Sequence, residues 1–183
     1  MKLEHLLYYL DGEQGVKEHR LDGCFFAGQY PAGLDHVVLW EDPYYLLVPR
    51  DSDLAERQEI AVDEVEGKYP FIPTTESFDE GSVIWEEYQR LARSSRMDFQ
   101  PQENRMAVSM VEAGLGVAVL PGLDLMDLAP GREVKAVPLA GGLSRAVGML
   151  LPREAERSNL TEAFLDLVQT VVEDWKQTLS PEE

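Results

Sequence analysis

The amino-acid sequence predicts an α/β fold in which strands and helices alternate along the chain. Short stretches rich in Val, Ile, Phe, Tyr and Leu, bounded by turn residues, have the composition of β-strands. Several are apolar without interruption, as parallel strands covered on both faces are. Segments with helical periodicity fall between them, which implies βαβ crossovers and a largely parallel sheet. At 183 residues, 44% hydrophobic and 27% charged, the chain can bury the core of one ordinary domain or of two small lobes.

Seven strands and three shorter helices are expected along the chain. The strands are Leu3–Leu10, Gly23–Ala27, Asp42–Val48, Tyr69–Pro73, Gly116–Leu120, Val134–Pro138 and Ala146–Leu151. The shorter helices are Gln14–Arg20, Gly81–Arg93 and Arg105–Ala113.

A longer helix is expected near the C-terminus, with Ser158 as its N-cap. Apolar residues recur there at spacings of three and four, which predicts an amphipathic helix that covers a sheet. They are Leu160, Phe164, Leu167, Val168, Val171, Val172 and Trp175.

The stretch VEAGLGVAVLPG, from Val111 to Gly122, joins a helix to a strand. Gly114 and Gly116 invite comparison with a dinucleotide-binding fingerprint, but Val119 stands where the third small residue should be. The glycines also follow a helix and enter a strand, the reverse of what phosphate binding at a helix N-terminus needs. We therefore expect Gly114 to adopt a left-handed conformation that ends the helix, and Gly116 to allow close backbone packing.

Two turns predict the lobe boundaries. A charged turn at Pro49–Ala55 ends an apolar strand, and a new set of elements follows it. The glycine-containing turn Ala140–Ser144 precedes one strand and the long helix, which can return to the first lobe. We expect one lobe from residues 1–51 and 149–183, and a second from residues 52–148.

Charge and composition argue against several classes of protein. Lys and Arg total 16 against 34 Asp and Glu, a net charge of −18, and this field would repel a polyanion such as DNA. Apolar runs fall far short of the roughly 20 residues that cross a bilayer, and the first residues show no signal-peptide pattern, so no membrane association is expected. The single cysteine, Cys24, excludes an internal disulfide and favours the cytoplasm.

Residues for catalysis or metal binding are not arranged in any diagnostic pattern. His5, His19, His36 and Cys24 lack the spacing of metal ligands, and no Gly-x-Ser-x-Gly elbow occurs. Carboxylates are so abundant that neighbouring pairs indicate solvated helix faces rather than acid–base chemistry. We expect no catalytic residue, no metal and no cofactor, so the chain is not expected to be an enzyme.

Several segments, which together extend over nearly the whole chain, occur in an order and at spacings that match one known family. They are HRLDGCFFAG (His19–Gly28), LLVPRDSDLAERQEIAVDEVEGKYPFIP (Leu46–Pro73), VSMVEAGLGVAVLP (Val108–Pro121) and SRAVGMLLPR (Ser144–Arg153). Together they resemble the regulatory, effector-binding domain of LysR-type transcriptional regulators, and the third segment is the most specific. Ser52 and Asp53 depart from the resemblance, because the family usually has His-Pro there.

The resemblance implies two flavodoxin-like lobes joined by crossover strands, a fold like that of type 2 periplasmic binding proteins. It also implies a small-molecule effector in the interlobe cleft, assembly into homodimers or homotetramers, and transcriptional control in the cytoplasm. DNA would be reached only through a helix-turn-helix domain, and nothing of that kind precedes Met1 here.

The start of the first lobe also departs from the family pattern, which opens with a further strand and helix before the segment that Leu3–Leu10 resembles. Loss of a central strand would leave backbone groups unpaired in a core. Either the sequence is a fragment, or the first lobe is rearranged or completed by a partner.

The expected effector site begins with the loop after the strand Tyr69–Pro73. Thr74, Thr75, Glu76, Ser77 and Phe78 supply hydroxyls, backbone N–H groups and an aromatic ring, a suitable cradle for a carboxylate or other polar ligand. The resemblance implies that this loop contacts the effector. The alternative is ordinary helix capping by Thr75 or Ser77.

Two further groups complete the expected site. Glu103, Asn104 and Arg105 precede the third helix, where Arg105 could pair with an anionic effector or simply with one of the many carboxylates. Phe26, Ala27 and Gly28 end a strand of the first lobe and would form the opposite wall of the cleft, with Phe26 alternatively part of the core.

These residues support an effector-sensing domain whose ligand shifts the arrangement of the lobes and so of the oligomer that presents DNA-binding heads. The alternative is a headless regulator-like partner that pairs with full-length relatives and needs no ligand. A transport role is conceivable for this fold, but the lack of a signal-peptide pattern argues against it.

Overall fold

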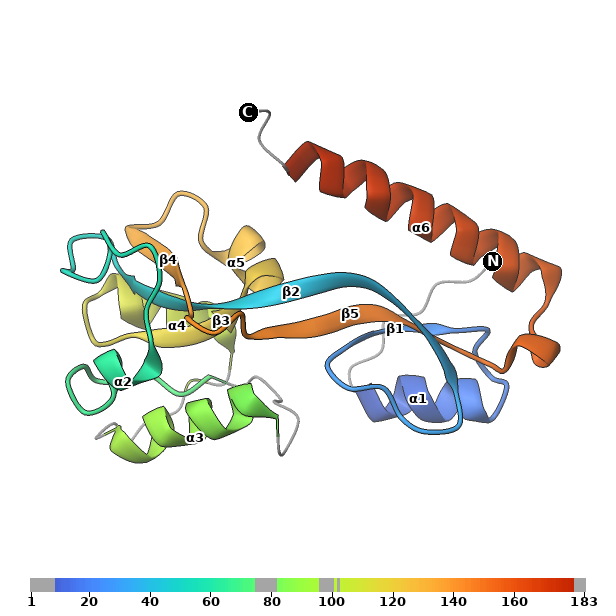
Figure 1. Ribbon diagram of the computed structural model, residues 1–183, viewed down its shortest axis with the longest axis horizontal. Coiled ribbons are helices and arrows are strands. Elements are labelled where there is room, and N and C mark those ends of the chain that lie inside the picture. The colour runs from blue at the N-terminus through green and yellow to red at the C-terminus, as the bar shows by residue number, and fades with distance from the viewer. Residues whose placement is uncertain (1–8, 75–81, 96–100, 102, 180–183) are drawn as a thin grey trace. The chain divides into compact units, whose positions relative to one another are not determined.

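The computed structural model describes residues 9–74, 82–95, 101 and 103–179 (Figure 1). The chain divides into two compact units, which we call unit 1 (Met1–Glu41 with Ala146–Glu183) and unit 2 (Asp42–Arg145). The unit boundaries, after residues 41 and 145, come earlier in the chain than the expected lobe boundaries after residues 51 and 148. The expected lobe boundaries themselves stay a prediction.

Helices and strands are interspersed along the chain, but they do not alternate strictly as the sequence predicts, because β1 and β2, the helices α2 to α4, and β4 and β5 follow one another directly. The helices are α1 (Tyr9–Lys17), α2 (Val62–Val65), α3 (Val83–Ser94), α4 (Asn104–Glu112), α5 (Gly122–Leu128), the 3₁₀ helix η1 (Glu154–Glu156) and α6 (Asn159–Leu179). The strands are β1 (Cys24–Ala27), β2 (Asp35–Pro49), β3 (Ala118–Pro121), β4 (Val134–Pro138) and β5 (Ser144–Leu151).

The strands form a mixed sheet in the order β1-β5-β2-β3, with β4 also paired to β2. The β1/β5, β2/β3 and β2/β4 pairs are antiparallel, and parallel pairing occurs at the bridges Ile60–Leu139 and Phe71–Val117. The α/β class is therefore confirmed, but the expected largely parallel sheet is wrong for these strand pairs, and parallel pairing is confined to the two isolated bridges. Since β2 and β5 each contain a unit boundary, both strands run from one unit into the other.

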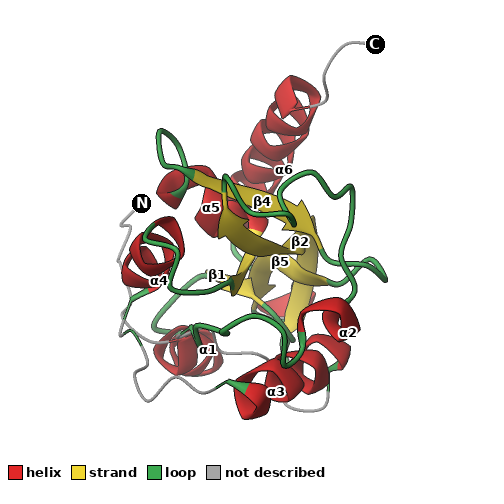
Figure 2. Ribbon diagram, turned by 90° about the vertical axis from the view of Figure 1, so that its left-hand side faces the viewer, coloured by secondary structure: helices red, strands yellow, loops and turns green. Residues whose placement is uncertain are grey.

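The core of unit 2 lies on both faces of its strands. Leu46 of β2 and Val119 of β3 pack with α2 and α3 in one cluster, whereas Leu47 and Leu120 pack with α4 and α5 in another. Figure 2 shows α2 and α3 on one side of these strands and α4 and α5 on the other. Neighbouring residues along a strand point to opposite faces, so covering both faces explains why the runs are apolar without interruption.

The core of unit 1 is smaller and is covered by α6. Leu165 packs against Leu39 of β2 and Met149 of β5, and the indole rings of Trp40 and Trp175 lie 4.6 Å apart. Ser158 caps the helix as expected, because its Oγ accepts the backbone N–H of Thr161 at 3.1 Å.

Not all the apolar side chains that form the helical pattern of α6 are buried. Leu160, Leu167 and Val171 are 61%, 56% and 56% exposed, so they do not belong to the cover over the sheet. They lie at positions separated by seven and four residues, which places them together on one side of the helix. The sequence prediction was right about the helix and wrong about these three side chains.

Other elements differ from the predictions for identifiable reasons. Tyr9 and Leu10 begin α1 instead of ending the expected strand Leu3–Leu10, whose other residues lie outside the described chain. The expected strand Tyr69–Pro73 is reduced to the bridge at Phe71. Neither α2 nor α5 was predicted, because one or two turns give too few residues to show a helical period.

The end of α4 confirms the interpretation of the two glycines. Gly114 has φ +73°, its N–H donates to the Val111 carbonyl, and the Leu115 N–H donates to the Met110 carbonyl. This pair of bonds is the Schellman arrangement that ends helices. A Cβ on Gly116 would lie 2.3 Å from the Pro70 carbonyl oxygen, so only glycine allows this approach of β3 to the segment that carries Phe71.

Replacing Gly116 by alanine should destabilise the protein by about 3 kcal/mol, at the upper end of overpacking costs, because backbone must move to accept the methyl group. Urea unfolding measures the change in free energy. Gly67→Ala is the control, because Gly67 has φ +70° and open space around it, so only left-handed strain of about 1 kcal/mol is added. Equal losses in the two variants would contradict the close packing at Gly116.

Candidate functional site

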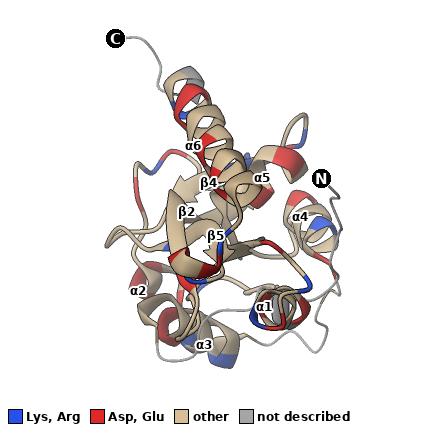
Figure 3. Cartoon of the chain, turned by 90° about the vertical axis from the view of Figure 1, so that its right-hand side faces the viewer, with Lys and Arg blue, Asp and Glu red and all other residues tan. Residues whose placement is uncertain are grey.

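Acidic residues are distributed over much of the molecule, including α1, α2, α4, α5 and α6 (Figure 3). Most arginines with described side-chain contacts are held by these carboxylates. Arg132 pairs with Glu112 at 2.9 Å, and Arg157 contacts Asp35 at 2.6 Å and Glu162 at 3.2 Å. An arginine whose ion pair with a carboxylate is long or exposed is therefore the better candidate for binding an anionic ligand.

Thr74 is fixed firmly at the edge of the unit 2 core. Its backbone N–H donates to the Tyr88 hydroxyl at 2.6 Å, and that hydroxyl donates to the Thr74 carbonyl at 3.0 Å. Thr74 is 2% exposed and Tyr88 6%, and the Tyr88 ring meets Phe71 edge to face with centroids 5.3 Å apart. Helix α3 thus fixes the point from which the predicted effector loop departs.

The remaining residues of that loop, Thr75, Glu76, Ser77 and Phe78, lie outside the described residues. Their binding role stays a prediction, as does capping by Thr75 or Ser77. Helix α3 itself is capped by Ser82, whose Oγ accepts the backbone N–H of Trp85 at 3.2 Å.

Glu103, Asn104 and Arg105 form the start of α4. Glu103 is exposed and occupies the N-cap position without a side-chain capping bond, and the first turn contains no acidic residue. The Asn104 amide donates to Asp124 Oδ2 of α5 at 2.7 Å. The start of α4 therefore offers polar groups at the positive end of a helix.

Arg105 adds a positive charge at this position. Its Nη2 lies 3.8 Å from Asp127 Oδ2, and the two side chains are 61% and 81% exposed. An ion pair with that separation and exposure contributes little to stability. Both expected alternatives for Arg105 thus remain compatible with its surroundings.

An ion-pair network that the sequence did not reveal lies beside α4. Asp42, 1% exposed, accepts from Arg145 Nε at 3.0 Å and from the Leu123 N–H at 2.9 Å. Arg145 Nη2 also lies 3.5 Å from Asp124 Oδ1. The only signal in the sequence was a carboxylate at the start of an apolar strand, and its partner arginine is far along the chain.

The unit 1 residues of the expected site have different environments. Phe26 is 3% exposed and meets the Tyr30 ring edge to face at 6.0 Å, which supports its role as a core residue. Ala27 is exposed, and Gly28 has φ +112° with its N–H donating to the Ala146 carbonyl at 2.8 Å. Their expected contact with an effector stays a prediction.

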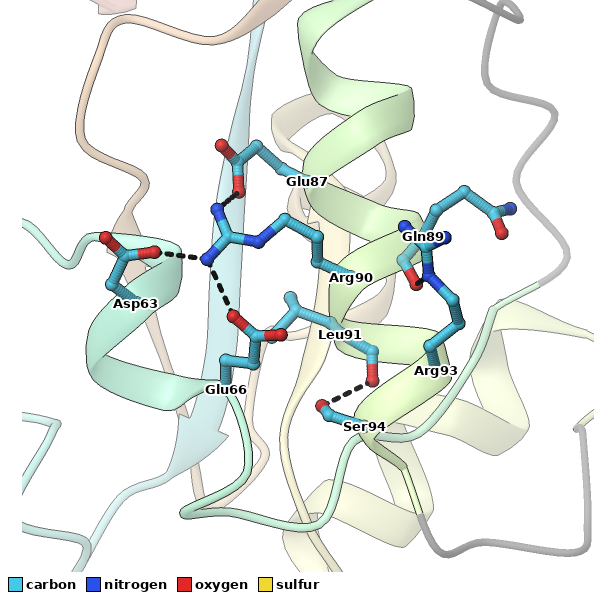
Figure 4. Close-up of polar contacts among 8 residues, drawn as sticks. All are labelled: Asp63, Glu66, Glu87, Gln89, Arg90, Leu91, Arg93 and Ser94. Atoms are coloured by element: carbon cyan, nitrogen blue, oxygen red, sulfur yellow. Dashed lines mark hydrogen bonds and ion pairs between the residues drawn. The ribbon is translucent and has the colours of Figure 1, made fainter.

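The exposed face of α3 carries a second group of charged residues (Figure 4). Arg90 contacts Asp63, Glu66 at 2.6 Å and Glu87 at 2.9 Å, and its hydrogen bonds with Asp63 and Glu66 raise the pKa of the guanidinium. Figure 4 shows Arg90 turned toward α2, so this cluster joins the two helices. An arginine shared by three carboxylates is a poor candidate for a further anionic ligand.

Cys24 is a half-buried thiol of unit 1. Burial raises the pKa of the Cys24 thiol to about 11, with a further contribution from Glu13, so little reactive thiolate forms at neutral pH. Among the described residues, no three His, Cys, Asp or Glu side chains are grouped so as to hold a metal ion. In the same part of the chain, no helix has the length and apolar character needed to cross a membrane.

Comparison of the sequence with known proteins gives a family. A family described as the LysR substrate binding domain matches residues 10–173. Relatives include the HTH-type transcriptional regulators YybE of Bacillus subtilis (strain 168), 27% identical over 128 residues, and YbhD of Escherichia coli (strain K12), 29% identical over 151 residues. The alignments cover 69% and 81% of this chain but only 42% and 46% of those relatives.

Solved structures give the same fold at low sequence identity. The regulatory domain of Synechocystis PCC6803 CcmR, solved in complex with 2-PG, has a TM-score of 0.68 at 17% identity, with 87% of this chain and 77% of that chain covered. The LysR family regulator HinK of Pseudomonas aeruginosa also has a TM-score of 0.68 at 17% identity, with coverages of 89% and 56%. This chain therefore has the fold of LysR regulatory domains, which is like that of type 2 periplasmic binding proteins.

Tyr88→Phe should destabilise the protein by about 1–3 kcal/mol, because the N–H and carbonyl of buried Thr74 lose a partner. Urea unfolding measures the loss. Tyr69→Phe is the matched control, since its hydroxyl bonds the Asp53 carboxylate near the surface and should contribute at most about 0.5 kcal/mol. If the two substitutions cost the same, the Tyr88 hydroxyl does not anchor Thr74.

Cys24 should react slowly with a disulfide reagent at pH 7. A pKa raised from 9.0 to about 11 lowers the thiolate fraction about a hundredfold, and the rate should climb as the pH rises toward that value. The same chain unfolded in urea is the control. Equal rates for the folded and unfolded chains would show that burial does not protect this thiol.

Proposed function

The chain belongs to the family of LysR substrate-binding domains, and we propose that it senses a small anionic effector, with Arg105 and Asn104 at the start of α4 as contacts. The coarse function, an effector-binding regulatory domain of a LysR-type regulator, is that of the family. The finer statement names the charge of the ligand and the residues that hold it.

The observation that carries the proposal is the weak pairing of Arg105. Its contact with Asp127 is 3.8 Å long and exposed to solvent, in a protein whose other arginines include several in shorter ion pairs. An anionic ligand would gain a charge-assisted hydrogen bond from Arg105 and displace little. The positive end of α4 would add to the same attraction.

The fixed position of Thr74 supports the same site. Tyr88 holds the Thr74 backbone on both its N–H and its carbonyl, so the following residues start from a rigid point in unit 2. Loops that bind ligands are commonly positioned in this way by a rigid scaffold. We propose that Thr75–Phe78 approach the effector from that point.

The regulatory output is proposed to depend on assembly. Effector binding would favour one arrangement of a dimer or tetramer, and DNA would be reached through helix-turn-helix domains like those named in the relatives. Ligand can shift such an equilibrium only by its differential affinity for the two arrangements. We propose that the protein acts in the cytoplasm, where transcription is controlled.

An alternative function needs no ligand: a partner that pairs with full-length regulators. The exposed side chains Leu160, Leu167 and Val171 on α6 favour it, because apolar side chains gathered on one helix face suit a protein contact. Mixing with a full-length regulator should then give heterodimers without any small molecule present. Ligand binding in the isolated chain would favour the sensing role instead.

Thermal-shift screening of small carboxylates, aromatic acids and amino acids should find compounds that raise Tm, because a ligand bound only to the folded state stabilises it. For the best compound, Arg105→Ala should weaken binding at least about tenfold, since a hydrogen bond to a charged group contributes roughly 1.5–3 kcal/mol. Arg93→Ala on α3 is the control of equal charge change. No stabilisation across the panel, or equal losses in the two variants, would refute the proposal.

A further inference from the structure

The strands β2 and β5 carry opposite charges at the positions where they enter unit 2. Asp42 is the first residue of this unit and Arg145 the last. Their side chains are 1% and 15% exposed, and Arg145 Nε donates to Asp42 Oδ2 at 3.0 Å. A buried charge that loses its partner is strongly destabilising, so each charge constrains the other.

Helix α5 is attached to this pair at its first turn. Asp42 Oδ1 accepts the Leu123 N–H at 2.9 Å, which satisfies a donor that a helix leaves unpaired. A Cβ on Gly122 would lie 3.1 Å from Asp42 Oδ1, so glycine at this position leaves room for the carboxylate. The helix and the strand β2 are therefore held together by a hydrogen bond and by close packing.

Asp124 extends the contacts to α4. One of its oxygens lies 3.5 Å from Arg145 Nη2, and the other accepts from the Asn104 amide at 2.7 Å. Asn104 is beside Arg105, the proposed anchor of the effector. A continuous series of polar contacts thus joins the start of α4 to both long strands.

We propose that Asn104, Asp124, Arg145 and Asp42 form a positioning network that couples the start of α4 to the entry of β2 and β5 into unit 2. The regulatory meaning of this coupling rests on the proposed function. An anion held by Arg105 competes with Asp124 for the Asn104 amide and repels its carboxylate. Because Arg145 is shared between Asp124 and Asp42, a shift of Asp124 changes the balance of charge at Asp42.

Hydrogen exchange on this 183-residue chain tests the coupling without any ligand. In Asn104→Ala and in Asp124→Asn, the Tyr44 amide should exchange at least about fivefold faster, because its bond to the Leu143 carbonyl lies next to the network. Amides of β4 in the same unit should keep their rates. Asp63→Asn, a charge change of the same kind on α2, should leave both regions unchanged.

A double-mutant cycle separates a network from independent contacts. Asn104→Ala and Arg145→Gln together should change Tyr44 exchange by clearly less than the product of the single effects. Should Arg145→Gln fail to fold, the Asp124→Asn cycle with Asn104→Ala replaces it. The coupling would be overturned if amide exchange accelerated equally in β4 and at Tyr44, or if the effects of the two substitutions on the Tyr44 exchange rate multiplied. Either result leaves the proposed function to be tested by the effector screen.

Discussion

The constraint on which unit 2 depends is burial of its strands on both faces. Residues alternate between the cluster that packs on α2 and α3 and the cluster that packs on α4 and α5, so almost every position of β3 must be apolar. Helices held against opposite faces of the same strands have fixed positions relative to one another. Helices α4 and α5 pack on the same face, so the N-terminus of α4 meets the first turn of α5 there, and the hydrogen bond between Asn104 and Asp124 depends on this packing.

Charge adds a second condition. With a net charge of −18, the molecule as a whole repels an anion, so any anionic ligand must be attracted by local groups. Most arginines with described partners are neutralised nearby, as Arg90 is by three carboxylates. Arg105 and Arg50 differ, because their carboxylate partners lie 3.8 Å and 3.5 Å away and both pairs are exposed, and of these two arginines only Arg105 lies in the first turn of a helix. Under the proposed function, this distribution of charge would repel most anions and still allow one to bind at the start of α4.

Much of this fold could be predicted from local signals in the sequence. The cap at Ser158 and the left-handed Gly114 were predicted because each depends on the type of one residue and its near neighbours. Strand pairing was predicted less well, since antiparallel and parallel partners are chosen by residues far apart in the chain. Exposure of Leu167 and Val171 could not be predicted either, because periodicity places a side chain on a helix face without saying what covers that face.

The residues of the candidate site also differ in whether local sequence signals could predict them. Arg105 was found because a cation before a helix is visible in the sequence, whereas the Asp42–Arg145 pair needs the tertiary structure. Chemical-shift mapping of the ¹⁵N-labelled chain with the carboxylate that most raises its Tm tests the central claim most directly. We expect the largest amide shifts to cluster at Thr74 and at Asn104–Arg105. Shifts confined to the exposed face of α3, or scattered without a centre, would contradict it.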